Sequence, residues 1–246
     1  TKMINQPVSM PVAIAPTGLT GMQRADGEIL AAQAAEEFGI PYTLSTMSVC
    51  SIEAVAAKTT KPFWFQLYVM KDKEFVKNII SRAQKAKCDA LVVTMDLPLL
   101  AQRHKDIRNG LSAPPKLGIN QIFQLIRRPE WCMRMIFSKN KTFGNILGHA
   151  KGVKDMTSIA SWTNEQFDQE LTWDYVKWIK KLWGGPLILK GILDIEDAEE
   201  ALNIGAEGII VSNHGGRQLD GTSSSILALE KIATKIGLNL EVYIDG

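Results

Sequence analysis

The residues best suited to chemistry lie together in one glycine-rich turn. The stretch V-S-N-H-G-G-R-Q-L-D-G, from Val211 to Gly221, follows an apolar run and places His214 and Arg217 three residues apart. An imidazole can accept a proton near neutral pH, and a guanidinium can hold a carboxylate through two parallel hydrogen bonds. The neighbouring glycines let the backbone turn tightly against a ligand. The sequence therefore predicts a general base and a carboxylate anchor on a single loop.

The elements that position this turn alternate along the chain. Short apolar runs are followed by longer stretches with helical periodicity, a pattern typical of parallel sheets joined by right-handed crossovers. The predicted strands are residues 12–15, 42–44, 63–67, 90–95, 186–190, 208–211 and 241–245. This alternation fits a doubly wound sheet as well, but polar residues recur at the carboxyl ends of the runs, which favours a (β/α)8 TIM barrel. We expect an α/β barrel truncated at both ends, with about seven strands present.

Four of the expected helices have recognisable starts. An aspartate or serine side chain can accept hydrogen bonds from the free N–H groups of a first helical turn. Residues of this kind stand before helical patterns at Asp26, Asp72, Asp194 and Ser223. We expect each of these helices to follow one strand.

Composition limits the class of protein. The 246 residues are 46% hydrophobic, enough for one large core, and we treat residues 1–246 as a single domain. The formal net charge of +2 gives no reason to expect a nucleic-acid partner. Cys50, Cys88 and Cys132 form no C-x-x-C pair, so we expect neither a disulfide framework nor a metal site. No run of 18 apolar residues is present to span a membrane.

One connection is far longer than usual. The insertion of about residues 97–170 separates the fourth and fifth predicted strands, and between Arg108 and Lys154 it carries nine Lys or Arg against a single Glu130. Apolar residues within it recur at helical spacing, at Ile119, Ile122, Phe123 and Ile126. An amphipathic helix beside basic residues suits an anionic membrane surface. A solvated basic loop that packs a few apolar side chains on the barrel fits the composition equally well.

Five segments, in the same order, resemble the FMN-dependent 2-hydroxy acid dehydrogenases and oxidases over the whole chain. They are the turn 211–221, A-P-T-G-L-T-G-M at 15–22, T-L-S-T-M-S-V-C at 43–50, W-F-Q-L-Y-V at 64–69 and L-K-G-I-L-D at 189–194. The similarity is greatest to the membrane-associated bacterial members that oxidise L-lactate. The resemblance implies FMN as cofactor, a small L-2-hydroxy acid as substrate, and a quinone or cytochrome as electron acceptor. It also implies a homo-oligomer at the cytoplasmic face of the inner membrane.

The same resemblance assigns cofactor-binding residues to the strand ends. Those that would contact the flavin ring are Pro16, Thr17, Gly18, Ser45, Gln66 and Thr94. Lys190 would stabilise the negative charge that a reduced flavin develops. Ser212 would meet the flavin and its ribityl chain. Asp245 and Gly246 would begin the loops that hold the phosphate, most of which lie beyond this chain, so retention of FMN by the fragment stays open.

On the substrate side, the resemblance makes His214 the catalytic base. Asp96 would pair with it and favour the imidazolium that forms when His214 accepts a proton. Arg103 and Arg217 would neutralise the substrate carboxylate, and the Tyr68 hydroxyl would contact that carboxylate or the oxidised carbonyl. Residue types do not decide whether His214 removes the α-proton or the hydroxyl proton.

Two residues depart from other members of the family. Met47 stands where plant-type glycolate oxidases carry a tryptophan, and Gly18 where an alanine is common. A flexible methionine suits the methyl group of lactate but also admits a longer side chain. A mandelate, glycolate or long-chain 2-hydroxy acid dehydrogenase or oxidase therefore remains an alternative, as does a catalytically inactive barrel fragment.

Overall fold

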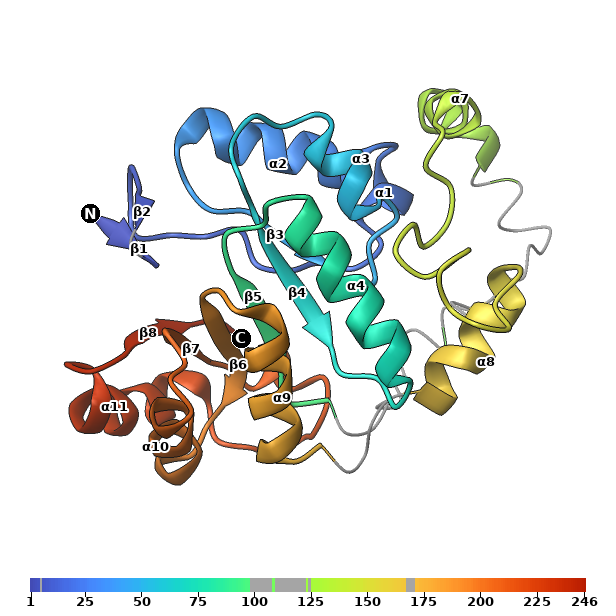
Figure 1. Cartoon of the computed structure of the whole chain (residues 1–246). Helices are drawn as coiled ribbons and strands as arrows, with labels where there is room; N and C mark the ends of the chain where they lie inside the picture. Colours follow the sequence, from blue (N-terminus) through green and yellow to red (C-terminus); the bar gives the residue numbers. More distant parts are fainter. Residues whose placement is uncertain (5, 98–107, 109–122, 124, 167–170) are drawn as a thin grey trace.

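The computed structural model describes residues 1–4, 6–97, 108, 123, 125–166 and 171–246. At its centre is a six-stranded parallel sheet in which each strand pairs with the next one along the chain (Figure 1). A strictly sequential order is that of a barrel wall, whereas a doubly wound sheet reverses its order at a switch point. The strands are β3 (Thr43–Ser45), β4 (Trp64–Tyr68), β5 (Leu91–Thr94), β6 (Leu187–Ile192), β7 (Gly208–Val211) and β8 (Glu241–Ile244).

The predicted first strand, residues 12–15, is reduced to one parallel bridge at Ile14. Two backbone hydrogen bonds of 2.8 and 3.0 Å join Ile14 to residues 41–43. Pro11 and Pro16 flank the segment, and a proline has no N–H to offer a strand ladder. The prediction of seven strands in the sheet was therefore wrong by one, although the segment does run beside β3 as expected.

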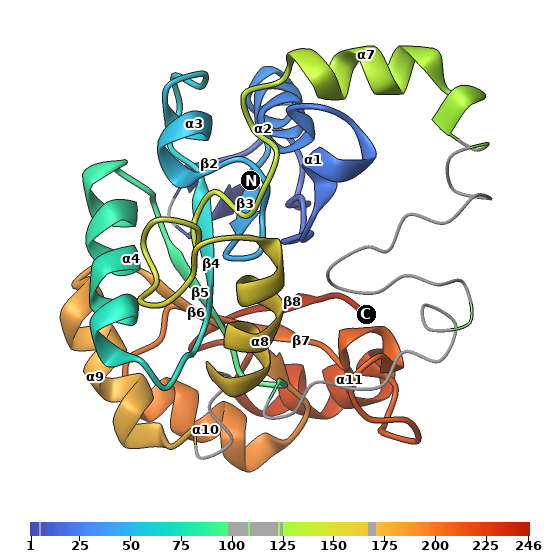
Figure 2. The same cartoon turned by 90° about the vertical axis from the view of Figure 1, so that its right-hand side faces the viewer.

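Helices lie against the outer face of the sheet (Figures 1 and 2). The main apolar core is between these layers, where Val76 and Ile79 of α4 and Val176 and Ile179 of α9 are fully buried. The helices are α1 (Thr20–Gln23), α2 (Gly27–Phe38), α3 (Ile52–Ala56), α4 (Lys73–Lys85), α7 (Pro129–Phe137), α8 (Met156–Gln166), α9 (Trp173–Trp183), α10 (Ile195–Asn203) and α11 (Ser225–Ile236).

Two of the four predicted helix starts are capped as expected. The Asp72 carboxylate accepts from the N–H groups of residues 74 and 75, and Asp194 accepts from residue 196. Asp26 stands at the start of α2 but in a left-handed conformation, and its carboxylate caps nothing. The last helix begins one residue later than predicted, after Ser224 instead of Ser223.

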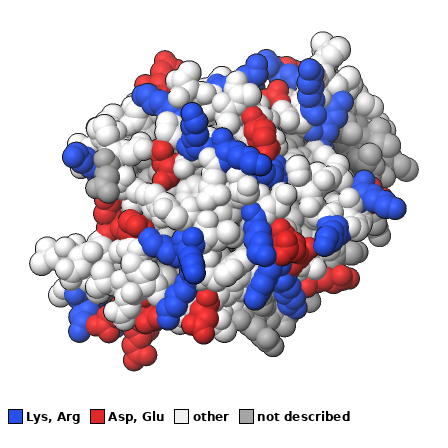
Figure 3. All heavy atoms as spheres, viewed as in Figure 1, with Lys and Arg blue, Asp and Glu red and all other residues white. Residues whose placement is uncertain are grey.

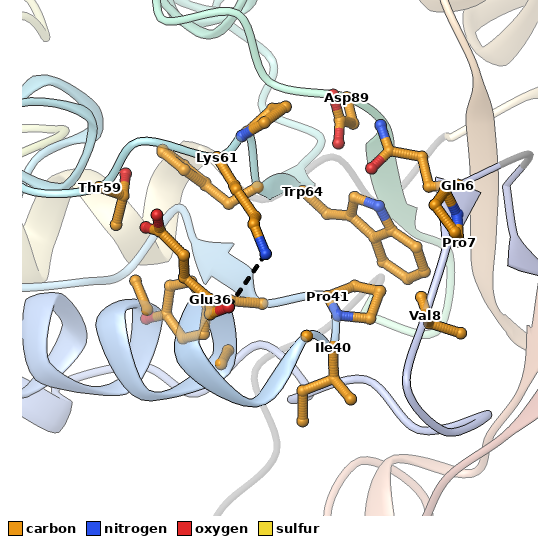
Figure 4. A pocket seen from close by; sticks show the side chains of 16 residues that line it. Gln6, Pro7, Val8, Glu36, Ile40, Pro41, Thr59, Lys61, Trp64 and Asp89 are labelled. Carbon is orange, nitrogen blue, oxygen red and sulfur yellow. Dashed lines mark hydrogen bonds between the residues drawn. The ribbon is translucent and has the colours of Figure 1, made fainter.

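The amino-terminal end of the barrel is closed by a short antiparallel pair that the sequence did not predict, β1 (Lys2–Met3) and β2 (Gln6–Pro7). Met3 and Ile4 are buried there against Trp64 and other interior side chains. A cavity of about 70 Å³ lies beside the pair (Figure 4), where Lys61 Nζ donates to the Glu36 carbonyl at 3.3 Å. Its lining includes Tyr42, Phe63 and Asp89, which lie just before β3, β4 and β5, so the cavity is at the end opposite to the strands' carboxyl termini.

The described part of the long insertion includes α7 and α8, which were not predicted. α8 packs on the loop after β4, where Gln166 accepts a hydrogen bond from the N–H of Lys71 at 2.8 Å and Phe75 meets Trp162 edge to face. α7 stands apart from the sheet (Figure 2) and is attached to α1 through Trp131, whose indole N–H donates to the Met22 carbonyl at 3.1 Å. The helix predicted around Ile119 to Ile126 lies mostly outside the described residues.

Candidate active site

A chain of buried polar side chains crosses three neighbouring strands at their carboxyl ends. The Ser45 hydroxyl on β3 donates to Gln66 Oε1 on β4 at 3.0 Å, and Gln66 Nε2 donates to Thr94 Oγ1 on β5 at 2.8 Å. All three residues are at most 4% exposed. Thr94 accepts in this chain, so its own hydroxyl proton remains for another acceptor. The structure thus brings together three of the residues predicted to contact a flavin.

The loop that follows β3 is held by a residue from the insertion. Asn145 is fully buried, and its Nδ2 donates to Ser48 Oγ at 2.9 Å and to the Ser45 carbonyl at 3.3 Å. Arg82 of α4 donates to the Asn145 carbonyl at 3.1 Å and forms an ion pair with Glu53 at 2.7 Å. The Arg82 hydrogen bond lowers the pKa of Glu53 to about 2. Sequence reasoning missed Asn145, because no motif surrounds it.

A buried cation lies on the next strand along. Lys190 of β6 is 6% exposed, and its Nζ donates to Ser212 Oγ at 2.8 Å and to Asp245 Oδ1 at 3.0 Å. A buried ammonium group is stable only when its charge is paired and its protons are shared. The two bonds use two of its three protons, so one more can be donated to a ligand. Lys190, Ser212 and Asp245, predicted from three separate segments, form one cluster.

The catalytic pair predicted from the sequence is also assembled. His214 Nδ1 lies 3.0 Å from Asp96 Oδ1, although the two residues are 118 positions apart. The backbone N–H of His214 donates to Ser212 Oγ at 3.1 Å, which connects the pair to the lysine cluster. Because Nδ1 faces the carboxylate, Nε2 is the nitrogen that can face a substrate. Asp96 Oδ2 is buried and has no hydrogen-bond partner among the residues the structure describes.

The turn that carries His214 is strained. It forms the 3-10 helix η1 (His214–Gly216), and His214 itself has a φ of 57°, a left-handed value that costs a non-glycine residue energy. The Asn213 side chain accepts from the Gly215 N–H at 3.0 Å and holds the turn. Strain of this kind persists where the surrounding contacts impose a geometry, as the Asp96 contact does here.

The other residues predicted to contact the substrate have fewer described contacts with the pair formed by His214 and Asp96. Arg217 ends the same turn with an exposed side chain, and its N–H donates to the His214 carbonyl at 3.3 Å. Tyr68 ends β4 in register with Thr94 of β5. Arg103 lies outside the described residues, so its predicted role is carried by the resemblance alone.

The remaining cofactor predictions fall on the loop after residues 12–15 and on the last residue. Pro16 is half-buried, whereas Thr17 and Gly18 are exposed. The loop approaches the one after β3, because the Leu19 N–H donates to the Met47 carbonyl at 3.0 Å. Gly246 is exposed and follows Asp245 directly.

The described residues contain no group of three His, Cys, Asp or Glu side chains placed to hold a metal ion. Nor does any helix within the described ranges have the length and apolar character needed to cross a bilayer. Acidic and basic side chains are interspersed on the face in Figure 3, with no broad area of one sign.

Comparison with known proteins identifies the family to which the chain belongs. Residues 1–246 match the model of the FMN-dependent dehydrogenases. The chain belongs to that family. An L-lactate dehydrogenase of Vibrio parahaemolyticus is 43% identical over 247 residues, and one of Acinetobacter baumannii is 44% identical over 250. Each match covers 100% of this chain but only 65% and 64% of the relative, so the chain spans about two thirds of their length.

Solved structures agree with the fold. A monotopic membrane protein, (S)-mandelate dehydrogenase, superposes with a TM-score of 0.91 at 31% identity and covers 100% of this chain and 65% of its own. A mandelate oxidase superposes with a TM-score of 0.78 at 33% identity, over 100% of this chain and 61% of its own. The family resemblance and the incomplete barrel predicted from the sequence are confirmed.

Proposed function

We propose that the protein uses FMN to oxidise a small L-2-hydroxy acid, L-lactate, to the 2-keto acid. The observation that carries this proposal is the 3.0 Å contact between His214 and Asp96, which two hydrogen bonds through Ser212 Oγ connect to the buried Lys190. A base and a cation at one rim suit a reaction that removes a proton and two electrons from an anionic substrate.

The residues present fit FMN. A flavin ring offers carbonyl and nitrogen acceptors along its polar edge. Lys190 and Thr94 can each donate one further proton to such acceptors. Ser45 and Gln66 would extend that edge, with Pro16 to Gly18 against the ring and Ser212 at the sugar chain. When bound, FMN supplies the two-electron acceptor. The charge of Lys190 would stabilise negative charge on the reduced ring.

His214 takes a proton from the substrate, either from the α-carbon or from the hydroxyl group. Asp96 orients the ring through Nδ1 and stabilises the positive charge that the ring then carries. Arg217 and Arg103 hold the carboxylate as two guanidinium anchors, and Tyr68 donates its hydroxyl to the same end of the substrate. Either route to the keto acid needs the same base and the same anchors.

Similarity to two L-lactate dehydrogenases supports lactate as the substrate. Oxidation of (S)-mandelate is the second candidate, supported by the TM-score of 0.91 with (S)-mandelate dehydrogenase. Met47 can accommodate either a methyl or a phenyl group, because its unbranched side chain adapts to different shapes.

The substrate test is anaerobic bleaching of the bound flavin. The FMN-loaded protein should lose its visible absorbance fastest with L-lactate and much more slowly with glycolate and (S)-mandelate, and D-lactate should leave it unchanged. Faster bleaching by D-lactate would refute the proposed stereochemistry, and faster bleaching by (S)-mandelate would favour the second candidate.

We further propose that electrons pass to a quinone or cytochrome and that the protein is a peripheral homo-oligomer at the cytoplasmic face of the inner membrane. Support for the membrane surface comes from α7, which presents Met133, Ile136 and Phe137 to solvent at 60%, 66% and 79% exposure. Exposed Lys139 and Lys141 follow directly. Apolar side chains beside lysines suit a helix lying in an anionic lipid surface.

A further inference from the structure

Gly191 follows Lys190 on β6, and the space where its side chain would be is filled by Asp96. A Cβ built on Gly191 would lie 2.6 Å from Asp96 Cβ and Cγ and 2.8 Å from Oδ2. Carbon atoms in protein interiors stay close to 3.5 Å apart or more. Gly191 also has a φ of +102°, a value that residues with a side chain rarely adopt.

The crowding could not be relieved by turning the aspartate aside. Rotation about χ1 moves Cγ and the carboxylate but leaves Asp96 Cβ where the backbone puts it. That backbone is held, because the Met95 N–H donates to the Lys190 carbonyl at 2.8 Å and Thr94 pairs with Lys190. Any side chain at position 191 must therefore separate the ends of β5 and β6, and Asp96 moves with them.

The same glycine changes the direction of the side chains on β6. Ile188 points into the barrel, and so does Lys190, two residues later, where it meets Ser212 and Asp245. Strict alternation would send Ile192 inward too, but Ile192 is buried in the outer core. The sheet register shifts between Lys190 and Ile192 at this point, as in a bulge. Gly191 thus lies between Lys190, whose side chain points to the candidate site, and Ile192, whose side chain packs in the outer core.

We propose that Gly191 is a positioning residue, which keeps the Asp96 carboxylate within hydrogen-bond reach of His214 by leaving that space free. The inference rests on the proposed function of this pair. It adds that the geometry of the base depends on an absent side chain on β6, the strand beside β7, from whose end the His214 turn begins.

The test compares Gly191→Ala, Asp96→Asn and the double variant in the FMN-loaded protein. Because displacement by about 1 Å can cost on the order of 100-fold in rate, Gly191→Ala should lower kcat for L-lactate by about that factor. The KM should change by less than about threefold and the flavin spectrum should persist, since position 191 is not among the proposed flavin contacts or the proposed carboxylate anchors. In the Asp96→Asn background the same change should cost far less, because both act through one contact.

Gly205→Ala and Gly184→Ala are the matched controls. These glycines have φ values of +76° and +69°, and a Cβ on either would meet no atom within 4 Å. Each control should lose some thermal stability while kcat stays at the wild-type value. A wild-type kcat in Gly191→Ala, or a full additive loss in the double variant, would overturn the inference.

Two results keep this inference separate from the proposed function. If Asp96→Asn leaves kcat unchanged, the proposed role of the pair formed by His214 and Asp96 fails. If Asp96→Asn lowers kcat but Gly191→Ala leaves it unchanged, only the positioning role of Gly191 fails. Should Gly191→Ala prevent FMN binding, combining it with Asp96→Gly removes the opposing Cβ. The loss of Tm caused by Gly191→Ala should then be smaller in the Asp96→Gly background than in the wild type, with a remainder due to the φ of +102°. An equal loss of Tm in both backgrounds would contradict the proposed crowding.

Discussion

Lys190 and its two partners show how single side chains prepare the site for an anion. The ammonium group is buried, 3.0 Å from the Asp245 carboxylate, and 2.8 Å from the Ser212 hydroxyl. Asp245 neutralises the charge before any ligand arrives, which limits the cost of burying it. The third proton of the Lys190 ammonium group can then be donated to an acceptor on a ligand.

Replacing Lys190 should weaken FMN binding. In Lys190→Met the apolar stem is kept but the charged donor is lost, and one charge-assisted hydrogen bond is worth about 1.5–3 kcal/mol. The dissociation constant of FMN should rise roughly 10- to 100-fold in a fluorescence titration. Lys180→Met is the control, because Lys180 pairs with Glu207 at 2.7 Å on the helical side of the barrel. Equal FMN affinity in Lys190→Met and wild type would exclude the role proposed for this cation.

The residues of the site could be predicted where a local pattern carried them. His214 was found from its glycine-rich turn, and Lys190 from the polar end of an apolar run. Asn145 could not be found in this way, because its hydrogen bond to Ser45 joins residues 100 positions apart and lies in a segment without a motif. The crowding between Gly191 and Asp96 was equally invisible, since it depends on the relative height of two strands.

Among the helices, α4 and α10 were predicted most closely, because an aspartate cap with its own hydrogen bonds marks the start of each. α7 and α8 were missed for different reasons. α7 has no buried residue, so no burial pattern distinguishes it, and it starts with Pro129 instead of a capping side chain. α8 carries a mixed polar sequence whose packing on α4 is a tertiary effect.

Apolar residues of α7 should determine membrane binding. In Met133→Asp, Ile136→Asp and Phe137→Asp the transfer of each side chain into lipid is lost, which is worth at least about 1.5 kcal/mol, or roughly tenfold in partitioning. The measurement is co-sedimentation with vesicles that contain phosphatidylglycerol. Phe38→Asp provides the control, because Phe38 is 58% exposed on α2, away from α7. Unchanged sedimentation of the three α7 variants would show that α7 is not the contact surface.

The ion pair that links α3 to α4 should stabilise the fold in a pH-dependent way. The pKa of Glu53 is lowered from an ordinary 4.5 to about 2, chiefly by the Arg82 hydrogen bond. A carboxyl whose pKa is lower in the folded state contributes stability that is fully present above pH 4.5 and disappears as the pH falls towards 2.

Glu53→Gln should therefore lower the free energy of unfolding at pH 7 by about 1 kcal/mol, a value reduced because the side chain is 55% exposed. The difference from wild type should shrink when urea unfolding is repeated at pH 3.5. Glu74→Gln is the comparison, since Glu74 pairs with Lys77 at 2.8 Å on the surface and should show no effect. A loss for Glu53→Gln that is the same at both pH values would argue against the ion pair.

The molecule as a whole follows the alternation of strand and helix that the sequence displays. Fold class, the positions of the six strands β3 to β8 and the family were predictable, because hydrophobic periodicity and ordered motifs are local signals. The short pair β1 and β2 was not, since strands of two residues carry no periodicity. The parallel order of β3 to β8 then aligns all the strand carboxyl ends, which explains how residues from 45 to 245 reach one rim.

Anaerobic flavin reduction in His214→Gln tests most directly whether this rim is a redox site with His214 as its base. The variant should bind FMN like the wild type, and L-lactate should bleach its flavin at least about 1000-fold more slowly, because no group then takes the substrate proton. Bleaching of His214→Gln at the wild-type rate, with FMN fully bound, would contradict the proposed chemistry.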